Sequence, residues 1–163
     1  MHMSDDREIK ADPATVYAAI LDPEMLKACV PGASDVEGNP QDGYTATVTQ
    51  KVGPVKATFK GQVTMSDMVE NEKLTITGEG KGGAAGFAKG GATVTLAPAG
   101  EGATLLSYEV EAKVGGKLAQ LGSRLIDGFA KKMADQFFQN LQTRIEGGDD
   151  EPGGGTGEGE ETG

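Results

Sequence analysis

The sequence predicts an α+β fold in which one long amphipathic helix lies across a single curved antiparallel sheet. Two patterns indicate it. Over residues 44–114, runs of alternating apolar and polar side chains are typical of strands with one face in water. Over residues 116–145, apolar residues recur at spacings of three and four, which is typical of a helix with one apolar side. A chain of 163 residues is long enough for one domain with its own core.

Two short helices in tandem are expected near the N-terminus, after a strand near residues 7–10. Asp12 can cap the first helix with Pro13 at its first position, and Asp22 with Pro23 repeats the same start signal. The second helix is expected to end near residue 28, before a Pro-Gly pair.

The strands that follow show a period of two. In residues 55–65, Phe59 and Val63 fall on one face, while Lys60 and Gln62 fall on the other. A Gly-Pro turn joins this strand to the one before it. With the N-terminal strand, about six strands are expected, joined mostly as hairpins, the later ones within these ranges: 44–48, 55–65, 73–80, 90–98 and 104–114.

The closing helix is expected from Gly116 to about Ile145. Gly122 and Gly128 lie inside it, at a cost of roughly 1 kcal/mol each relative to Ala. Gly122 falls on the apolar stripe, where it would permit close packing against a strand. The stripe consists of Leu118, Leu121, Leu125, Phe129, Met133, Phe137, Leu141 and Ile145.

A glycine-rich stretch raises the question of a nucleotide site, because Gly78–Gly83 matches G-x-G-x-x-G. A dinucleotide fingerprint needs a strand that turns into a helix, whereas these glycines lie between two predicted strands. We therefore expect the glycines to let a strand bend. We also expect a mobile hairpin tip, in which Phe87, between Lys81 and Lys89, forms a lid over the mouth of a cavity.

The formal net charge is −10, but residues 146–163 hold seven carboxylates and no Lys or Arg, which leaves 18 acidic against 15 basic residues before them. Residues 147–163 are expected to be a disordered, acidic, glycine-rich tail after a folded domain of residues 1–146. The tail is interpreted as solubilising, or as an arm that contacts a basic partner. No clustered positive charge is visible along the chain, so nucleic-acid binding is not expected.

Several kinds of site lack their parts. Cys29 is the only cysteine and His2 the only histidine, which excludes an internal disulfide, a Cys- or His-based metal site and a Ser-His-Asp triad. No run approaches the roughly 20 apolar residues that span a bilayer, and the N-terminus lacks the apolar core of a secretory signal. We therefore expect a soluble, cytoplasmic protein.

Five segments occur in an order and spacing that match a known family: CVPGASDVE, VGPVKATFKGQV, GEGKGGAAGFAKGGATVTL, VGGKLAQLGSRLIDG and MADQFF. Over about residues 5–143, the chain closely resembles the family of the G-type subunit of carbon monoxide dehydrogenase, which lies within the START-like (SRPBCC) superfamily. The resemblance implies a helix-grip fold, in which a curved antiparallel sheet of about six or seven strands grips the C-terminal helix around an apolar cavity.

The resemblance also implies a binding protein that accompanies an aerobic molybdenum-containing carbon monoxide dehydrogenase. One implied role is carriage of an isoprenoid quinone of the menaquinone or ubiquinone type, or of a lipid, between that enzyme and the membrane respiratory chain. The other is recruitment of the enzyme to the membrane. Some relatives carry a hydrophobic C-terminal anchor, and this sequence has the acidic segment there, so only a transient contact with the membrane surface is expected.

On this basis, the cavity is expected to be lined by inward-phase residues of the strands and of the closing helix, with Phe87 at its mouth. Tyr108 is the inward residue whose hydroxyl would bond to a quinone carbonyl. For each residue, ordinary core packing is the alternative. The predicted lining is Phe59, Val63, Tyr108, Val110, Leu118, Leu121, Leu125, Phe129 and Met133.

Two other functions are open on the sequence. A cavity enzyme, such as a cyclase or hydrolase, needs a positioned acid or base, and the inward phases offer none besides Tyr108. Cys29 has no histidine to activate it. We therefore expect no catalytic residue, no metal and no covalent cofactor. A recruitment or assembly factor with a filled cavity would bind the dehydrogenase without carrying a ligand.

Overall fold

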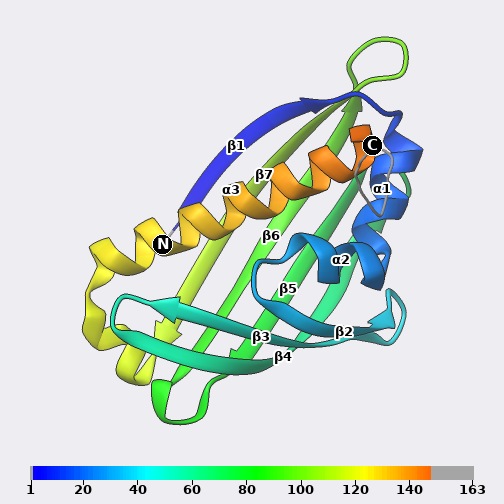
Figure 1. Ribbon diagram of the computed structural model, residues 1–163. Coiled ribbons are helices and arrows are strands. Elements are labelled where there is room, and N and C mark those ends of the chain that lie inside the picture. Colours follow the sequence, from blue (N-terminus) through cyan, green and yellow to red (C-terminus); the bar gives the residue numbers. More distant parts are fainter. Residues whose placement is uncertain (1, 148–163) are drawn as a thin grey trace.

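The computed structural model describes residues 2–147, in which one seven-stranded antiparallel sheet curves around a long helix (Figure 1). The strand order is β1-β7-β6-β5-β4-β3-β2, so the chain closes the sheet by placing its first strand beside its last. The strands are β1 (His2–Ile9), β2 (Ala33–Asn39), β3 (Gly43–Val52), β4 (Val55–Val69), β5 (Lys73–Lys81), β6 (Phe87–Pro98) and β7 (Thr104–Gly115). The predicted α+β class is confirmed. The predicted tail of residues 147–163 lies outside the described residues, apart from its first residue.

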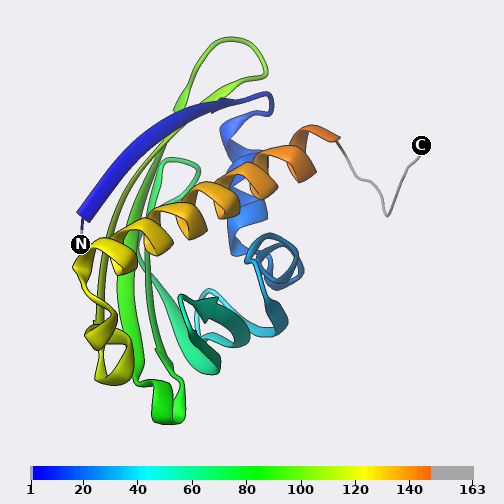
Figure 2. The same cartoon turned by 60° about the vertical axis from the view of Figure 1, so that its left-hand side comes forward.

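The two tandem helices form where their caps predict them. They are α1 (Pro13–Leu21) and α2 (Pro23–Cys29). The Asp12 carboxylate accepts from the Thr15 backbone N–H at 3.0 Å, and the Asp22 carboxylate accepts from the Glu24 N–H at 2.9 Å. These bonds satisfy N–H groups that a helix start otherwise leaves without a partner. Both helices lie near the C-terminal end of the long helix (Figure 2).

The closing helix is shorter than predicted. It is α3 (Ser123–Gly147), and it crosses the concave face of the sheet (Figures 1 and 2). Residues Gly116–Leu121 instead form the 3₁₀ turns η2, and Gly122, with φ of +92°, separates η2 from α3. A Cβ at Gly122 would meet no atom within 4 Å, so this glycine serves the left-handed backbone and not the predicted close packing.

Two apolar clusters hold the two ends of the fold. The larger cluster joins α1, α2 and the C-terminal half of α3 to the sheet, through residues such as Ile20, Leu74 and Leu141. The smaller one joins the β3–β4 hairpin, η2 and the start of α3 through Val52, Leu118 and Ile126. Because the clusters are separate, the space between them under α3 is free to hold something other than core side chains.

The strand β2 is an element that the sequence does not predict. In Ala33–Asn39 only Val36 is buried, so the segment has no alternation of apolar and polar residues to detect. It pairs with β3 as the edge of the sheet. Among the helices of residues 2–147, none is both long enough and apolar enough to cross a membrane.

Candidate functional site: an apolar cavity under the long helix

A cavity of about 480 Å³ lies between the concave face of the sheet and α3. This volume is within the range of roughly 300–1,000 Å³ that is typical of small-molecule sites. Its wall is made of apolar side chains almost throughout. The contributing residues include Leu26 and Val30 from α2 and its end, Val36, Tyr44, Ala46, Val48 and Val52 from β2 and β3, and Ile126, Phe129, Ala130, Met133, Ala134 and Phe137 from α3.

The floor of the cavity is a patch of glycine and alanine on three neighbouring strands. Gly78 of β5 is the partner of Gly90 in β6, which is the partner of Ala112 in β7. Cross-strand partners point to the same face of a sheet, so this row places no side chain larger than a methyl group under α3. We name these residues the small-residue floor: Gly78, Gly80, Ala88, Gly90, Ala92 and Ala112.

The glycines of the floor are there for two different reasons. A Cβ on Gly90 would lie 2.5 Å from the Glu111 carbonyl oxygen, so the backbone itself requires glycine at that position. A Cβ on Gly78 would lie 3.7 Å from its nearest neighbour, a Val63 methyl carbon, which is ordinary contact. Glycine in a strand interior weakens the strand. Since the backbone does not require Gly78, its effect is to leave the cavity empty at that point.

Polar groups on the wall are already used by the fold. The Tyr44 hydroxyl donates to the Leu21 carbonyl oxygen at 2.6 Å. The Gln50 amide nitrogen donates to the Pro31 carbonyl oxygen at 2.5 Å. These bonds attach the helices and their following loop to the sheet, and neither donor needs a ligand to be satisfied.

The structure places six of the predicted lining residues on the cavity wall: Phe59, Val63, Val110, Leu118, Phe129 and Met133. They come from β4, β7, η2 and α3, so segments far apart in the sequence meet there. That they contact a ligand stays a prediction.

Phe87 does not lie at the mouth. It is the first residue of β6, and its neighbour Ala88 belongs to the cavity floor, so the alternation of strand side chains points Phe87 to the convex face. Its ring lies over Gly115, its partner on β7, where a Cβ would be 2.2 Å from a ring carbon. The side chain is 38% exposed. The predicted lid is therefore wrong for this residue.

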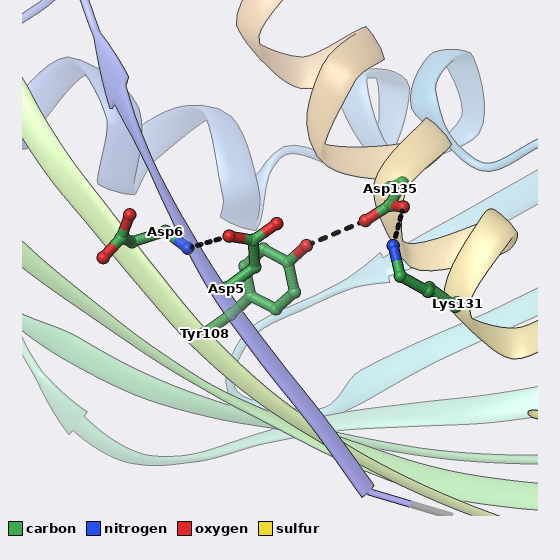
Figure 3. Close-up of polar contacts among 5 residues, drawn as sticks. All are labelled: Asp5, Asp6, Tyr108, Lys131 and Asp135. Atoms are coloured by element: carbon green, nitrogen blue, oxygen red, sulfur yellow. Dashed lines mark hydrogen bonds and ion pairs between the residues drawn. The ribbon is translucent and has the colours of Figure 1, made fainter.

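Tyr108 lies beyond the cavity, where the larger cluster fills the space under α3. Its ring stacks on Phe138 with centroids 4.1 Å apart, and its hydroxyl donates to the Asp135 carboxylate at 3.2 Å. Lys131 donates to the other oxygen of Asp135 at 2.8 Å, which completes a chain of polar contacts beside Asp5 (Figure 3). Burial and the Asp135 charge raise the pKa of Tyr108 to about 12. Its hydroxyl is engaged outside the cavity wall and is not the predicted quinone donor.

Leu121 and Leu125 are also off the wall. Leu121 ends η2 and packs against the smaller cluster of Val52, Leu118 and Ile126. Leu125 is 40% exposed and lies against the β3–β4 turn, where a Cβ on Gly53 would be 3.4 Å from a Leu125 methyl carbon. Because α3 starts after Gly122, its inward phase begins at Ile126 and not at Leu125.

Sequence reasoning missed the small residues of the wall. Ala130 and Ala134 of α3 face the cavity beside Met133, and the glycines and alanines of the floor face them. The signal was present in the glycine-rich stretch, where residues 78, 80 and 90 fall on one face of adjacent strands. Small residues escape a search for apolar stripes, although they are what makes room for a ligand.

The chemistry of the wall fits binding better than catalysis. Burial raises the pKa of the Cys29 thiol to about 11, and its side chain is fully buried in the larger cluster, away from the cavity wall. Glu79 and Glu111 border the cavity through strands whose inward residues are their neighbours Gly78, Gly80 and Ala112. Within residues 2–147, no group of three or more His, Cys, Asp or Glu side chains is placed to hold a metal ion.

The architecture is that of a START-like, helix-grip domain: a curved antiparallel sheet that grips a C-terminal helix around an apolar cavity. The family model of CoxG, the G-type subunit of carbon monoxide dehydrogenase, matches residues 6–146, and the chain belongs to this family. A comparison with curated protein sequences found no match.

Solved structures support the fold. A conserved protein from Geobacillus kaustophilus is similar, with a TM-score of 0.81 and 27% identity, over 90% of this chain and 95% of that one. A START superfamily protein from Mycobacterium smegmatis aligns with a TM-score of 0.66 and 17% identity, over 89% and 97% of the two chains. The Zhui aromatase/cyclase from a Streptomyces species aligns with a TM-score of 0.63 and 10% identity, over 90% and 93%. At these identities the last two show the fold alone.

Proposed function

We propose that the protein binds an apolar small molecule in the cavity under α3 and carries it, without catalysing its conversion. The observation that carries this proposal is the small-residue floor, above all Gly78, where glycine leaves space that the backbone does not require. A filled core would place larger side chains there, because unfilled apolar space costs stability.

The energetics of the wall favour an apolar ligand. Burial of apolar surface is favourable by about 25 cal/mol per Å², so a ligand that buries roughly 300 Å² gains on the order of 7 kcal/mol before ordering costs. The wall donors of Tyr44 and Gln50 are used by the fold, so shape and apolar contact would select the ligand more than hydrogen bonding.

The family membership supports a specific ligand and partner. Within this proposal, the ligand is an isoprenoid quinone of the menaquinone or ubiquinone type, or else a lipid. The protein exchanges it between a carbon monoxide dehydrogenase and the membrane respiratory chain, working in the cytoplasm and at the inner membrane surface. The support is the family to which the chain belongs, whose description names that enzyme.

The composition of the wall supports binding over a cyclase or hydrolase reaction, which would need a positioned acid or base. The inward-facing residues of α3 between residues 126 and 137 are aliphatic or aromatic. The likeness to an aromatase/cyclase extends to the fold only, at 10% identity.

The test is extraction of the protein, purified from a quinone-containing host, with organic solvent. The extract is analysed by ultraviolet absorbance and mass spectrometry. A quinone or lipid in near-stoichiometric amount is the expected result. An empty extract, together with capture of the dehydrogenase, would favour the recruitment role without a carried ligand. A chemically altered compound formed from an added thioester or polyketide would favour the enzyme.

A further inference from the structure

The convex face of the sheet carries an array of lysines that the sequence does not reveal. Three pairs of lysines are direct cross-strand partners: Lys51 with Lys56, Lys60 with Lys81, and Lys89 with Lys113. All six side chains are exposed. We name these six residues the lysine face. They come from five strands, so they form no cluster along the chain, and the expectation that positive charge is not clustered is wrong for the folded protein.

The pairing of these lysines is unfavourable in isolation. Like charges placed directly opposite on neighbouring strands destabilise a sheet, by amounts on the order of 0.2–1 kcal/mol per pair. None of the six forms an ion pair within 4 Å in the described part of the chain. Glu79, the partner of Lys89, and Glu111, two residues before Lys113, are the carboxylates that border the array. The local charge is therefore positive in a chain whose formal net charge is −10.

An exposed aromatic side chain lies within the same array. Phe87 is the partner of Lys81, so its ring lies on the convex face among the lysines. Lys89 is two residues further along β6 and points to the same side. An exposed aromatic ring surrounded by lysines combines apolar and cationic contact in one surface.

We propose that the lysine face and Phe87 dock the protein on an anionic lipid surface. Basic side chains near such a surface contribute about 1 kcal/mol each, and aromatic rings favour the membrane–water interface. The composition favours lipid over a protein partner, because lysine is depleted at protein interfaces and arginine enriched, and none of the six is arginine. The docking surface names a partner for the proposed function and rests on it only for what would be exchanged at the membrane.

The test is co-sedimentation of the full chain with phosphatidylglycerol-containing vesicles and with pure phosphatidylcholine vesicles, at low and raised salt. One variant carries Lys60→Glu, Lys81→Glu and Lys89→Glu. Its control carries Lys27→Glu, Lys73→Glu and Lys132→Glu, three exposed lysines outside the array, with the same change in net charge. Circular dichroism establishes that both variants fold.

We expect the wild type to bind the anionic vesicles at low salt and to be released by salt. The array variant should lose about a hundredfold or more in affinity, since each lysine contributes about 1 kcal/mol. The control should retain most of the binding. Phe87→Ala should weaken binding severalfold.

The proposal is overturned if the wild type does not bind the anionic vesicles, if it binds neutral vesicles equally, or if both triple variants lose binding equally. Tighter binding to an oligonucleotide than to the vesicles at the same salt would also overturn it, as would an unchanged affinity of Phe87→Ala for the aromatic contribution. Vesicle binding needs no cargo, whereas solvent extraction needs no membrane, so each of the two proposals can fail without the other.

Discussion

Gly78 and Gly90 are cross-strand partners in the middle of the sheet, and neither sends a side chain toward α3. Only Gly90 is fixed by its surroundings, since its Cβ would meet the Glu111 carbonyl oxygen at 2.5 Å. The difference between the two glycines separates the needs of the fold from the needs of the cavity.

Gly78→Val is expected to fill part of the cavity without disturbing the backbone, because its Cβ has ordinary contacts only. Ligand recovered by solvent extraction should fall roughly tenfold or more, as overpacking costs on the order of 1–3 kcal/mol. The thermal midpoint should stay or rise, because valine favours strands. The matched control is Thr77→Val, the next residue of β5 on the convex face, which should retain its ligand. Equal recovery from both variants would contradict the role of Gly78.

Tyr108→Phe is expected to retain the stack on Phe138 and to lose the hydrogen bond to Asp135. The free energy of unfolding should fall by about 1 kcal/mol, the ordinary net value of such a bond. Ligand recovery should not change, because Tyr108 lies off the cavity wall. Denaturant unfolding and solvent extraction of the same sample measure the two effects. A variant that folds normally and loses its ligand would restore Tyr108 as a donor to the ligand.

The titration of tyrosine should be displaced to high pH. The pKa of Tyr108 is raised to about 12, and burial also raises the pKa values of Tyr17 and Tyr44 above their usual 10.0. The unfolded chain releases these protons near its ordinary pKa, while the folded chain holds them. The stability from this source is thus present below about pH 10 and is lost as the pH rises toward 12. Phenolate absorbance in native and denatured protein is the measurement, and coincident titrations would disprove the displacement.

Cys29 should be inert in the native protein. Its side chain is fully buried, and burial raises the pKa of its thiol to about 11, so little reactive thiolate is present near neutral pH. A thiol-specific chromogenic reagent should react only after unfolding. Rapid reaction of the folded protein would show that the larger cluster around α2 opens readily.

Much of the fold could be predicted from local signals, because those signals act locally. Asp12 and Asp22 cap their helices through the hydrogen bonds that their side chains predict. The end of the stripe was harder to interpret: Leu118 and Leu121 have a spacing that one turn of either an α- or a 3₁₀-helix satisfies. Only the positive φ of Gly122 separates the two, and a glycine permits that conformation without requiring it.

The site could be predicted only in part, for a geometric reason. Tyr108 and Val110 share a face of β7, yet Val110 lines the cavity while Tyr108 packs under Phe138. Alternation tells which side of a sheet a residue faces, but not how far along the strand a cavity extends. The lysine face has the same origin, since cross-strand register brings together residues from distant parts of the chain.

The most direct test of a carrier cavity is titration calorimetry of the ligand-free protein with a menaquinone of short isoprenoid chain, repeated at several temperatures. We predict saturable, near-stoichiometric binding with a negative heat-capacity change, the signature of apolar burial, which weakens in Gly78→Val and persists in Thr77→Val. Absence of saturable binding to the wild type, or equal binding to both variants, would contradict a quinone-binding cavity under α3.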